Sequence, residues 1–171
     1  MGANRGILVK TDKAIQPLTA ARIFAKLVEK ERPGLVILGK QAIDDDANQT
    51  AQMLAALIDR PQATFASKVE IDGNLARVTR EVDVGLETLE VELPAVISVD
   101  LRLNTPRFIK LPDIMKAKSK PRETLELASL GVESGDHLTV THYAPPAKRQ
   151  KGVMVKDVPE LIAALKAKGL L

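Results

Sequence analysis

Three adjacent carboxylates, Asp44 to Asp46, are the residues of this sequence best placed to do chemistry. They lie between the apolar run Leu35–Leu38 and a segment with helical spacing. In an open α/β sheet, ligands bind beyond the carboxyl ends of the strands, so the connecting segment is a candidate ligand site. We call this segment the acidic loop. Its residues are Gly39, Lys40, Gln41, Ala42, Ile43, Asp44, Asp45, Asp46, Ala47, Asn48, Gln49 and Thr50.

Three functions compete for the aspartates. They could stabilise the start of the following helix by about 0.3–1 kcal/mol each, with one acting as its cap. They could help to bind Mg²⁺ beside a substrate phosphate, although adjacent residues of an extended segment point in different directions. They could also bind a nucleotide, with one carboxylate accepting a hydrogen bond from ribose or base while the amides of residues 48–50 hold a phosphate. The loop residues alone leave all three open.

A second unusual feature is a basic segment between Leu101 and Arg122, in which seven cations face one anion. Such a cluster indicates either a solvated face, with Leu111 and Ile114 buried beneath it, or a surface for an acidic partner. The cations are Arg102, Arg107, Lys110, Lys116, Lys118, Lys120 and Arg122.

Composition excludes several classes of protein. The 171 residues are 45% hydrophobic and suffice for a globular domain with a core. The absence of cysteine excludes disulfides and thiolate metal sites. Only four aromatic residues are available for base stacking, and the net charge is only +3, so nucleic acid is a poor candidate partner. The apolar runs are far shorter than the roughly 20 residues that cross a bilayer, so we expect no membrane insertion.

The elements that must position these residues follow from hydrophobic periodicity. Strand, loop and helix around the acidic loop make half of a βαβ unit and predict an α/β fold with a parallel sheet, into which an antiparallel hairpin is inserted. We expect helices over 17–30, through Ala51 and Leu54, and near the end of the chain. We expect strands covered on both faces at 35–38 and 95–99, hairpin strands over 69–83 and 89–93, a strand at 138–141, and an extended arm over 144–151.

Six motifs, taken in order, resemble the β subunits of the electron transfer flavoprotein family. The resemblance spans essentially the whole chain. The motifs are Leu38–Thr50, Pro61–Ser67, Arg80–Thr88, Leu93–Val96, Leu101–Arg107 and Leu111–Lys118.

The resemblance implies an electron carrier subunit without catalytic residues of its own. It implies a partial Rossmann-like, doubly wound sheet and a heterodimer with an α subunit that carries most of the FAD site. The β subunit holds a structural AMP, and the acidic loop looks like its site. The direct contacts are then Ala42, Asp45, Asn48, Gln49 and Thr50.

The resemblance also assigns partners. Electrons pass from acyl-CoA and other dehydrogenases to electron transfer flavoprotein-ubiquinone oxidoreductase and the respiratory chain, in the cytoplasm of a bacterium or the mitochondrial matrix of a eukaryote. Residues 107–120 resemble a recognition loop in which Leu111 enters an apolar pocket of the dehydrogenase. Arg80 and Glu81 are expected near the flavin domain of the α subunit. The other docking residues are Arg107, Pro112, Ile114, Met115 and Lys116.

Family β subunits carry further sheet before the position of Met1, so the resemblance implies an N-terminally truncated chain. Residues 1–143 would form an incomplete nucleotide-binding domain, and residues 144–171 an arm and helix that pack on the partner subunit. We expect weak or absent AMP binding and no electron transfer by the isolated chain. The alternatives are a nucleotide-binding enzyme or sensor that uses Asp44–Asp46 with Mg²⁺, and a docking module that acts through residues 107–120.

Overall fold

The computed structural model describes residues 2–135, 138–149 and 151–171. The chain divides into two compact units, residues 1–137 and 138–171. The first unit contains every strand of the described chain and carries both segments that the sequence singles out.

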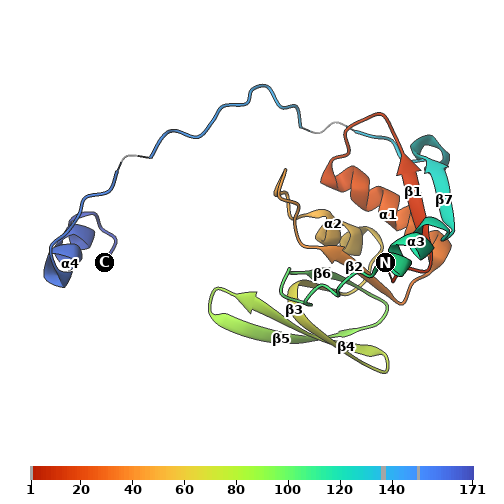
Figure 1. The fold of residues 1–171 in the computed structure, drawn as a ribbon, viewed down its shortest axis with the longest axis horizontal. Coiled ribbons are helices and arrows are strands. Elements are labelled where there is room, and N and C mark those ends of the chain that lie inside the picture. Colours follow the sequence, from red (N-terminus) through yellow and green to blue (C-terminus); the bar gives the residue numbers. More distant parts are fainter. Residues whose placement is uncertain (1, 136–137, 150) are drawn as a thin grey trace. The chain divides into compact units, whose positions relative to one another are not determined.

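A five-stranded mixed sheet organises the first unit (Figure 1). Strands β2, β6 and β3 are parallel, and β3, β4 and β5 are antiparallel. Strand β3 belongs to both parts: its first residues pair with β6 (Gln62 with Val96), and its last residues pair with β4. In sheet order the strands are β2 (Leu35–Gly39), β6 (Ala95–Val99), β3 (Gln62–Asp72), β4 (Leu75–Val82) and β5 (Gly85–Glu92).

Central strand β6 is covered on both faces, as predicted. Val96 packs with residues of the helices α1 (Pro17–Glu31) and α2 (Thr50–Leu57). Ile97, which points to the opposite face, packs against Ala63 and Val78 of the hairpin strands. The predicted helix over 17–30 and the half βαβ unit are therefore confirmed.

Strand β2 differs from the prediction of burial on both faces. It is an edge strand, and the Ile37 side chain is 55% exposed. Val36 and Leu38 pack towards the helices, whereas only Leu35 reaches the second core. The apolar run was a poor guide because it does not reveal whether a strand is central or at an edge.

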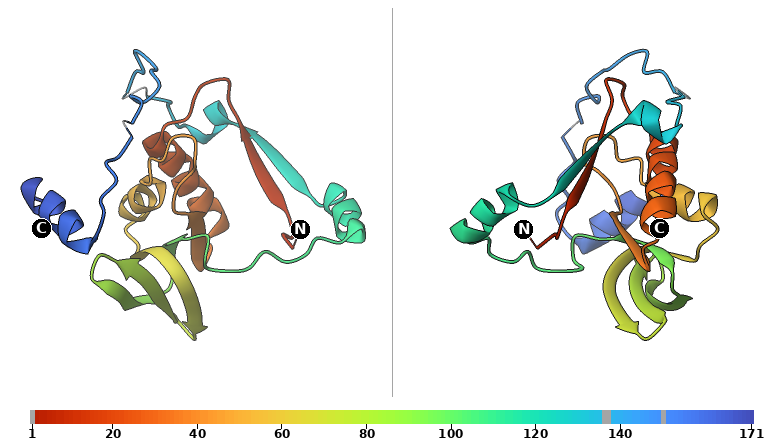
Figure 2. Two further views of the ribbon diagram at one scale, coloured as in Figure 1. Left: turned by 60° about the vertical axis from the view of Figure 1, so that its left-hand side comes forward. Right: turned by 90° about the vertical axis from the view of Figure 1, so that its right-hand side faces the viewer.

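A separate two-stranded parallel sheet joins β1 (Gly6–Lys10) to β7 (Arg122–Glu126). The 3₁₀ helix η1 (Leu127–Leu130) follows β7, and Leu127 packs against Ile23 of α1 in a third core cluster. The two strands run side by side in both views of Figure 2. Strand β7 was not predicted, because its five residues, RETLE, are mostly charged or polar.

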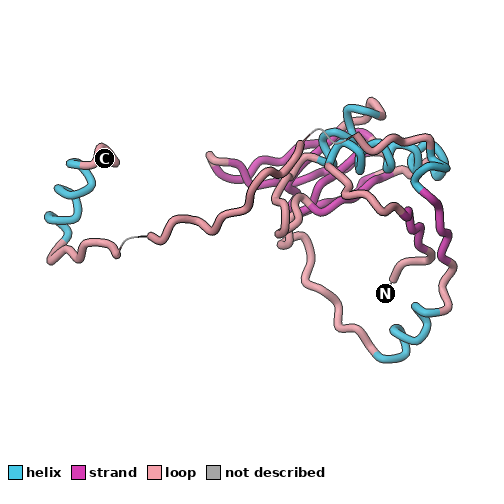
Figure 3. The backbone as a smooth tube through the Cα atoms, turned by 90° about the horizontal axis from the view of Figure 1, so that it is seen from above, coloured by secondary structure: helices cyan, strands magenta, loops and turns pink. Residues whose placement is uncertain are grey.

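The basic segment contains a helix that periodicity did not predict, α3 (Leu111–Lys118), which Figure 3 shows between long stretches of loop and strand. None of its residues is buried. Pro112 in its first turn, Asp113 near its start and Lys116 near its end are typical helix signals and could have revealed it.

The described residues of the second unit contain one helix, α4 (Val158–Ala167), which begins where the Asp157 side chain accepts a hydrogen bond from the Glu160 amide (2.8 Å). This helix was predicted. The prediction of a strand at 138–141 is wrong, because these residues lie in an irregular part of the chain that belongs to neither helix nor strand. The described residues of the arm form neither helix nor strand, and residue 150 lies outside the described part.

The α/β class, with its hairpin insertion and its C-terminal arm and helix, is thus confirmed. In the described chain, no helix is both long and apolar enough to cross a bilayer.

Candidate functional site

The acidic loop lies at the sheet edge where the parallel strands β2 and β6 both end, as predicted. Gly39 pairs with Val99, and the Lys40 amide donates to the Val99 carbonyl (2.9 Å). Between this loop and the start of α1 is a cavity of about 360 Å³, within the size range of small-molecule sites. Its lining residues are Gly39, Lys40, Gln41, Ala42, Asp45, Ala47, Asn48, Gln49 and Thr50 of the loop, with Ile15, Pro17 and Ala20.

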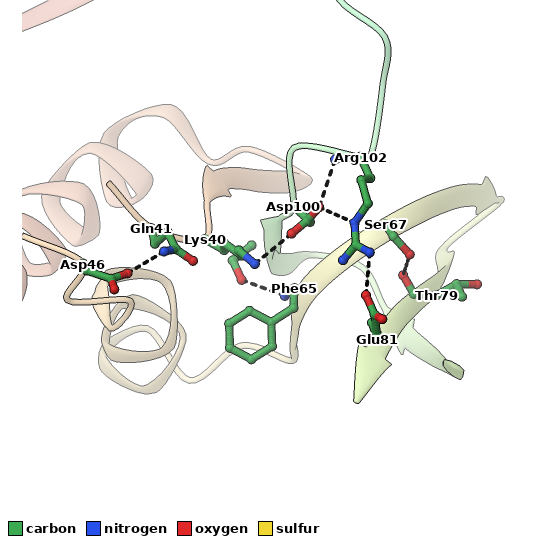
Figure 4. Close-up of polar contacts among 10 residues, drawn as sticks. Lys40, Gln41, Asp46, Phe65, Ser67, Thr79, Glu81, Asp100 and Arg102 are labelled. Carbon is green, nitrogen blue, oxygen red and sulfur yellow. Dashed lines mark hydrogen bonds and ion pairs between the residues drawn. The ribbon is translucent and has the colours of Figure 1, made fainter. Parts of the chain in front are cut away.

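The three aspartates hold the loop in shape and do not cap the next helix. Asp44 Oδ1 accepts a hydrogen bond from the Asp45 amide (3.0 Å), and Asp45 Oδ1 accepts from the Ala47 amide (3.3 Å). Asp46 accepts from the Gln41 side chain (Figure 4). Helix α2 begins only at Thr50, with no acidic residue in its first turn. The helix-capping interpretation is therefore wrong, because the left-handed residues Asp46 and Asn48 turn the chain between the aspartates and the helix.

Asn48 is the residue of the loop with the clearest capacity to bind a ligand. Its backbone lies in the left-handed region (φ 53°), and its carbonyl accepts from the Gln52 side chain (3.1 Å). Its side-chain Oδ1 is buried with no hydrogen-bond partner in the described structure. A buried acceptor without a donor costs about 1–3 kcal/mol, and native structures rarely leave one unexplained. A ligand with a hydroxyl or amino group in the cavity would satisfy it.

The start of α2 adds hydrogen-bond donors to the same site, which complement the acceptor Oδ1 of Asn48. Its N-cap residue Gln49 makes no side-chain cap, and the Met53 amide is the one that bonds back to the Gln49 carbonyl (3.0 Å). The amides of the first turn therefore lack intrahelical acceptors and, with the helix dipole, favour an anion. Gln49 and Thr50 also line the cavity. One cavity thus offers a buried acceptor and a set of anion-binding amides, which suits a phosphorylated nucleoside such as AMP.

An ion-pair network centred on the buried carboxylate of Asp100 joins this loop to the basic segment, and Asp100 was not singled out from the sequence. Asp100 directly follows β6 and is 5% exposed. Its carboxylate contacts Arg102 Nε (2.8 Å) and Lys40 Nζ (2.8 Å), and Arg102 in turn pairs with Glu81 (Figure 4). The hydrogen bonds from Arg102 and then Lys40 hold the pKa of Asp100 well below its usual range. A carboxylate after a continuous apolar strand, at the same sheet edge as Gly39, was the available signal.

Arg80 and Glu81 are neighbours on β4 and point to opposite faces. Arg80 donates to Glu87 Oε2 (2.6 Å) and to Thr64 Oγ1 (3.1 Å), whereas Glu81 pairs with Arg102. The two residues are therefore not a pair with each other. Their placement near a partner's flavin stays a prediction.

The residues predicted to dock a dehydrogenase lie on α3 and just before it, and their docking role stays a prediction. Leu111 is 71% exposed, and Met115, one turn further on the same face, is also exposed. Arg107, Pro112 and Lys116 are exposed as well, and Ile114 is half-buried. The interpretation in which Leu111 is buried beneath a solvated basic face is therefore wrong, since α3 presents this side chain to solvent.

Metal binding gains no support from side-chain positions. Among the residues that the structure describes, no three acidic or histidine side chains converge so as to hold a metal ion. The aspartates of the loop make the local hydrogen bonds given above.

Comparison with known proteins identifies relatives over nearly the whole chain. Residues 1–130 match the model of the electron transfer flavoprotein domain. The chain is 55% identical to the electron transfer flavoprotein subunit beta of Bradyrhizobium diazoefficiens, over 97% of its own length and 67% of that protein's. It is 56% identical to the mitochondrial subunit beta of Arabidopsis thaliana, over 97% and 67% of the two chains. The human subunit beta is 51% identical, over 99% and 68%.

Proposed function

Because this chain belongs to the electron transfer flavoprotein β-subunit family, we propose that it serves as the AMP-holding subunit of a heterodimeric electron carrier. Its partner is an α subunit that carries most of the FAD site. Electrons enter from acyl-CoA and other dehydrogenases and leave to electron transfer flavoprotein-ubiquinone oxidoreductase. The family name supports an electron carrier, and the cavity at the acidic loop supports the assignment of an AMP site to this chain.

The buried Oδ1 of Asn48 is the observation that carries the AMP assignment. AMP offers donors in its ribose hydroxyls and its adenine amino group, and either kind would satisfy this oxygen. Its phosphate matches the free amides at the start of α2, where Gln49 and Thr50 line the same cavity. Of the three aspartates only Asp45 lines the cavity, and its Oδ1 accepts from the Ala47 amide, whereas the carboxylates of Asp44 and Asp46 bond elsewhere within the loop.

In such a carrier this chain does no bond chemistry, and FAD on the α subunit supplies the electron transfer. The contribution of the β subunit is to bind, orient and dock. Residues 144–171 would cover the partner subunit, because α4 exposes Val158, Leu161 and Ile162, an apolar set that a single helix cannot bury.

We assign docking of the dehydrogenase to residues 107–120. An exposed leucine surrounded by cations fits a surface on which lysines raise the rate of encounter and one aliphatic side chain supplies contact energy. The expected targets are therefore acidic surfaces with a small apolar pocket.

Native mass spectrometry of the protein isolated from its own source tests this assignment. A larger second subunit, one FAD and one AMP bound with the β subunit are expected. A single chain near 18.5 kDa without nucleotide would contradict the proposal. A matched sample with Leu111→Ala should retain the subunit and both nucleotides, because Leu111 is exposed and does not line the cavity.

A further inference from the structure

The Asp100 carboxylate connects the two functional segments of the first unit. It contacts Lys40, the second residue of the acidic loop, and Arg102, at the start of the basic segment. Charged side chains are rarely buried unless they are paired. We infer that Asp100 is a positioning residue, which holds the acidic loop and the turn that opens the basic segment in one fixed arrangement.

On the loop side, Asp100 fixes Lys40 at the end of β6. The Lys40 amide donates to the Val99 carbonyl (2.9 Å), and its Nζ lies 2.8 Å from Asp100 Oδ2. Backbone and side chain of one residue are thus both attached to the end of the same strand. Lys40 lines the cavity, so its position sets where the loop begins to enclose a ligand.

On the basic side, Asp100 defines a turn. Its Oδ1 accepts from the Arg102 amide (3.0 Å) and from Arg102 Nε (2.8 Å), and its carbonyl accepts from the Leu103 amide (3.1 Å). Its own amide donates to the Ala66 carbonyl of β3 (2.8 Å). These bonds fix the direction in which residues 101–110 leave the sheet towards α3.

The two cations that contact Asp100 keep access to solvent. A positioning role for Asp100 can therefore be tested apart from a role in the stability of the fold. The side chains of Lys40 and Arg102 are 29% and 55% exposed, whereas that of Asp100 is 4% exposed. If the carboxylate is removed, both cations can turn to water, so no buried charge is left unpaired. The expected result is a folded chain with two loosened segments.

Amide hydrogen exchange of the full chain, resolved by NMR, tests the inference. Asp100→Ala is expected to speed exchange of the Lys40, Asp46, Arg102 and Leu103 amides by at least about tenfold, while amides of α1 keep their rates. Asp100→Asn keeps an oxygen for the Arg102 amide and should loosen mainly the acidic loop. The matched control is Asp83→Asn, the same change at an exposed turn, which should alter neither segment.

Two further variants keep the test decisive if the Asp100 variants fold poorly. Lys40→Met should loosen the acidic loop alone, and Glu81→Gln, which removes the other partner of Arg102, should leave the acidic loop unchanged. Unchanged exchange at Lys40 and Asp46 in Lys40→Met overturns the inference, as does unchanged exchange at either segment in Asp100→Ala.

One consequence rests on the proposed function: in the complex with the α subunit, Asp100→Asn should weaken AMP binding about tenfold. Lys40→Met should weaken it similarly, and the double variant should be no weaker than either, because both act through one contact. If the wild-type complex binds no AMP, the proposed function fails, and the exchange rates still decide the role of Asp100. If AMP binds wild type and Asp100→Asn equally and the loop exchange is also unchanged, the inference is overturned.

Discussion

Replacing Asn48 by glycine should separate what this residue does for the ligand from what it does for the fold. The backbone of Asn48 has φ 53°, a conformation that glycine adopts freely. Its Oδ1 is buried without a partner in the described structure. Asn48→Gly therefore removes an unsatisfied acceptor and leaves the loop conformation accessible, whereas Asn48→Ala removes the same acceptor but keeps a Cβ on a left-handed backbone.

The magnitudes follow from these two facts. Relief of a buried unsatisfied acceptor is worth about 1–3 kcal/mol. The glycine variant loses about 0.5–1 kcal/mol of stability, because its unfolded chain has greater conformational freedom. The ligand-free free energy of unfolding of Asn48→Gly should thus be between about 0 and 2.5 kcal/mol above wild type. Asn48→Ala should be about 1–2 kcal/mol less stable than the glycine variant, because alanine is strained at this φ.

AMP binding should change in the opposite direction. A neutral hydrogen bond contributes about 0.5–1.5 kcal/mol, so Asn48→Gly should weaken AMP binding about 2- to 13-fold. Urea unfolding of the isolated chain, followed by circular dichroism, gives the stability. Titration of AMP into the complex with the α subunit gives the affinity. Unchanged AMP affinity, together with a ligand-free chain destabilised by more than about 1 kcal/mol, would show that the oxygen is satisfied within the protein and refute the reasoning.

Three further outcomes are expected. Leu111→Ala should weaken binding to an acyl-CoA dehydrogenase by about 2 kcal/mol in surface plasmon resonance. Leu86 is an equally exposed leucine on β5, and Leu86→Ala should leave binding unchanged. Equal effects of the two variants would contradict a specific anchor. Ile97→Ala should lower the free energy of unfolding by about 2–5 kcal/mol in urea, because Ile97 is 0% exposed; a loss below about 1 kcal/mol would contradict its central place in the core. Because Arg102 and Lys40 lower the pKa of Asp100, its contribution is complete above about pH 4 and is lost at lower pH. The stability difference between wild type and Asp100→Asn should therefore be constant from pH 7 to about 5 and shrink below about pH 4; a difference that shrinks already at pH 6 would contradict the ion pairs.

Local patterns predicted much of the fold. The spacing of Ala21, Phe24 and Val28 indicated α1, and Asp72-Gly73 indicated the β3–β4 turn, where Gly73 has φ 59°. These features depend on residues close in sequence, so periodicity and turn chemistry suffice. The position of the acidic loop at the sheet edge also followed, because strand order was not needed to place it.

Features that depend on distant partners escaped prediction. Strand β7 is recognisable only by its pairing with β1, and Ile37 is exposed only because β2 lies at an edge. The role of Asp100 likewise depends on Lys40, sixty positions earlier in the chain. The position of the loop aspartates at the sheet edge was predicted correctly. Their hydrogen bonds within the loop depend on the loop conformation, which three adjacent aspartates in a sequence do not determine.

The pairing of β1 with β7 also bears on how the chain is made. Gly6 pairs with Arg122, so the two partners are 116 positions apart in the chain. At about 5–20 residues per second, synthesis of the intervening chain takes roughly 6–23 seconds. The hairpin β3–β4–β5 closes over short loops and can form soon after its residues leave the ribosome. During that interval β1 has no β7 to pair with, so this pairing becomes possible later than that of β2 with β6, whose partners are closer in the chain.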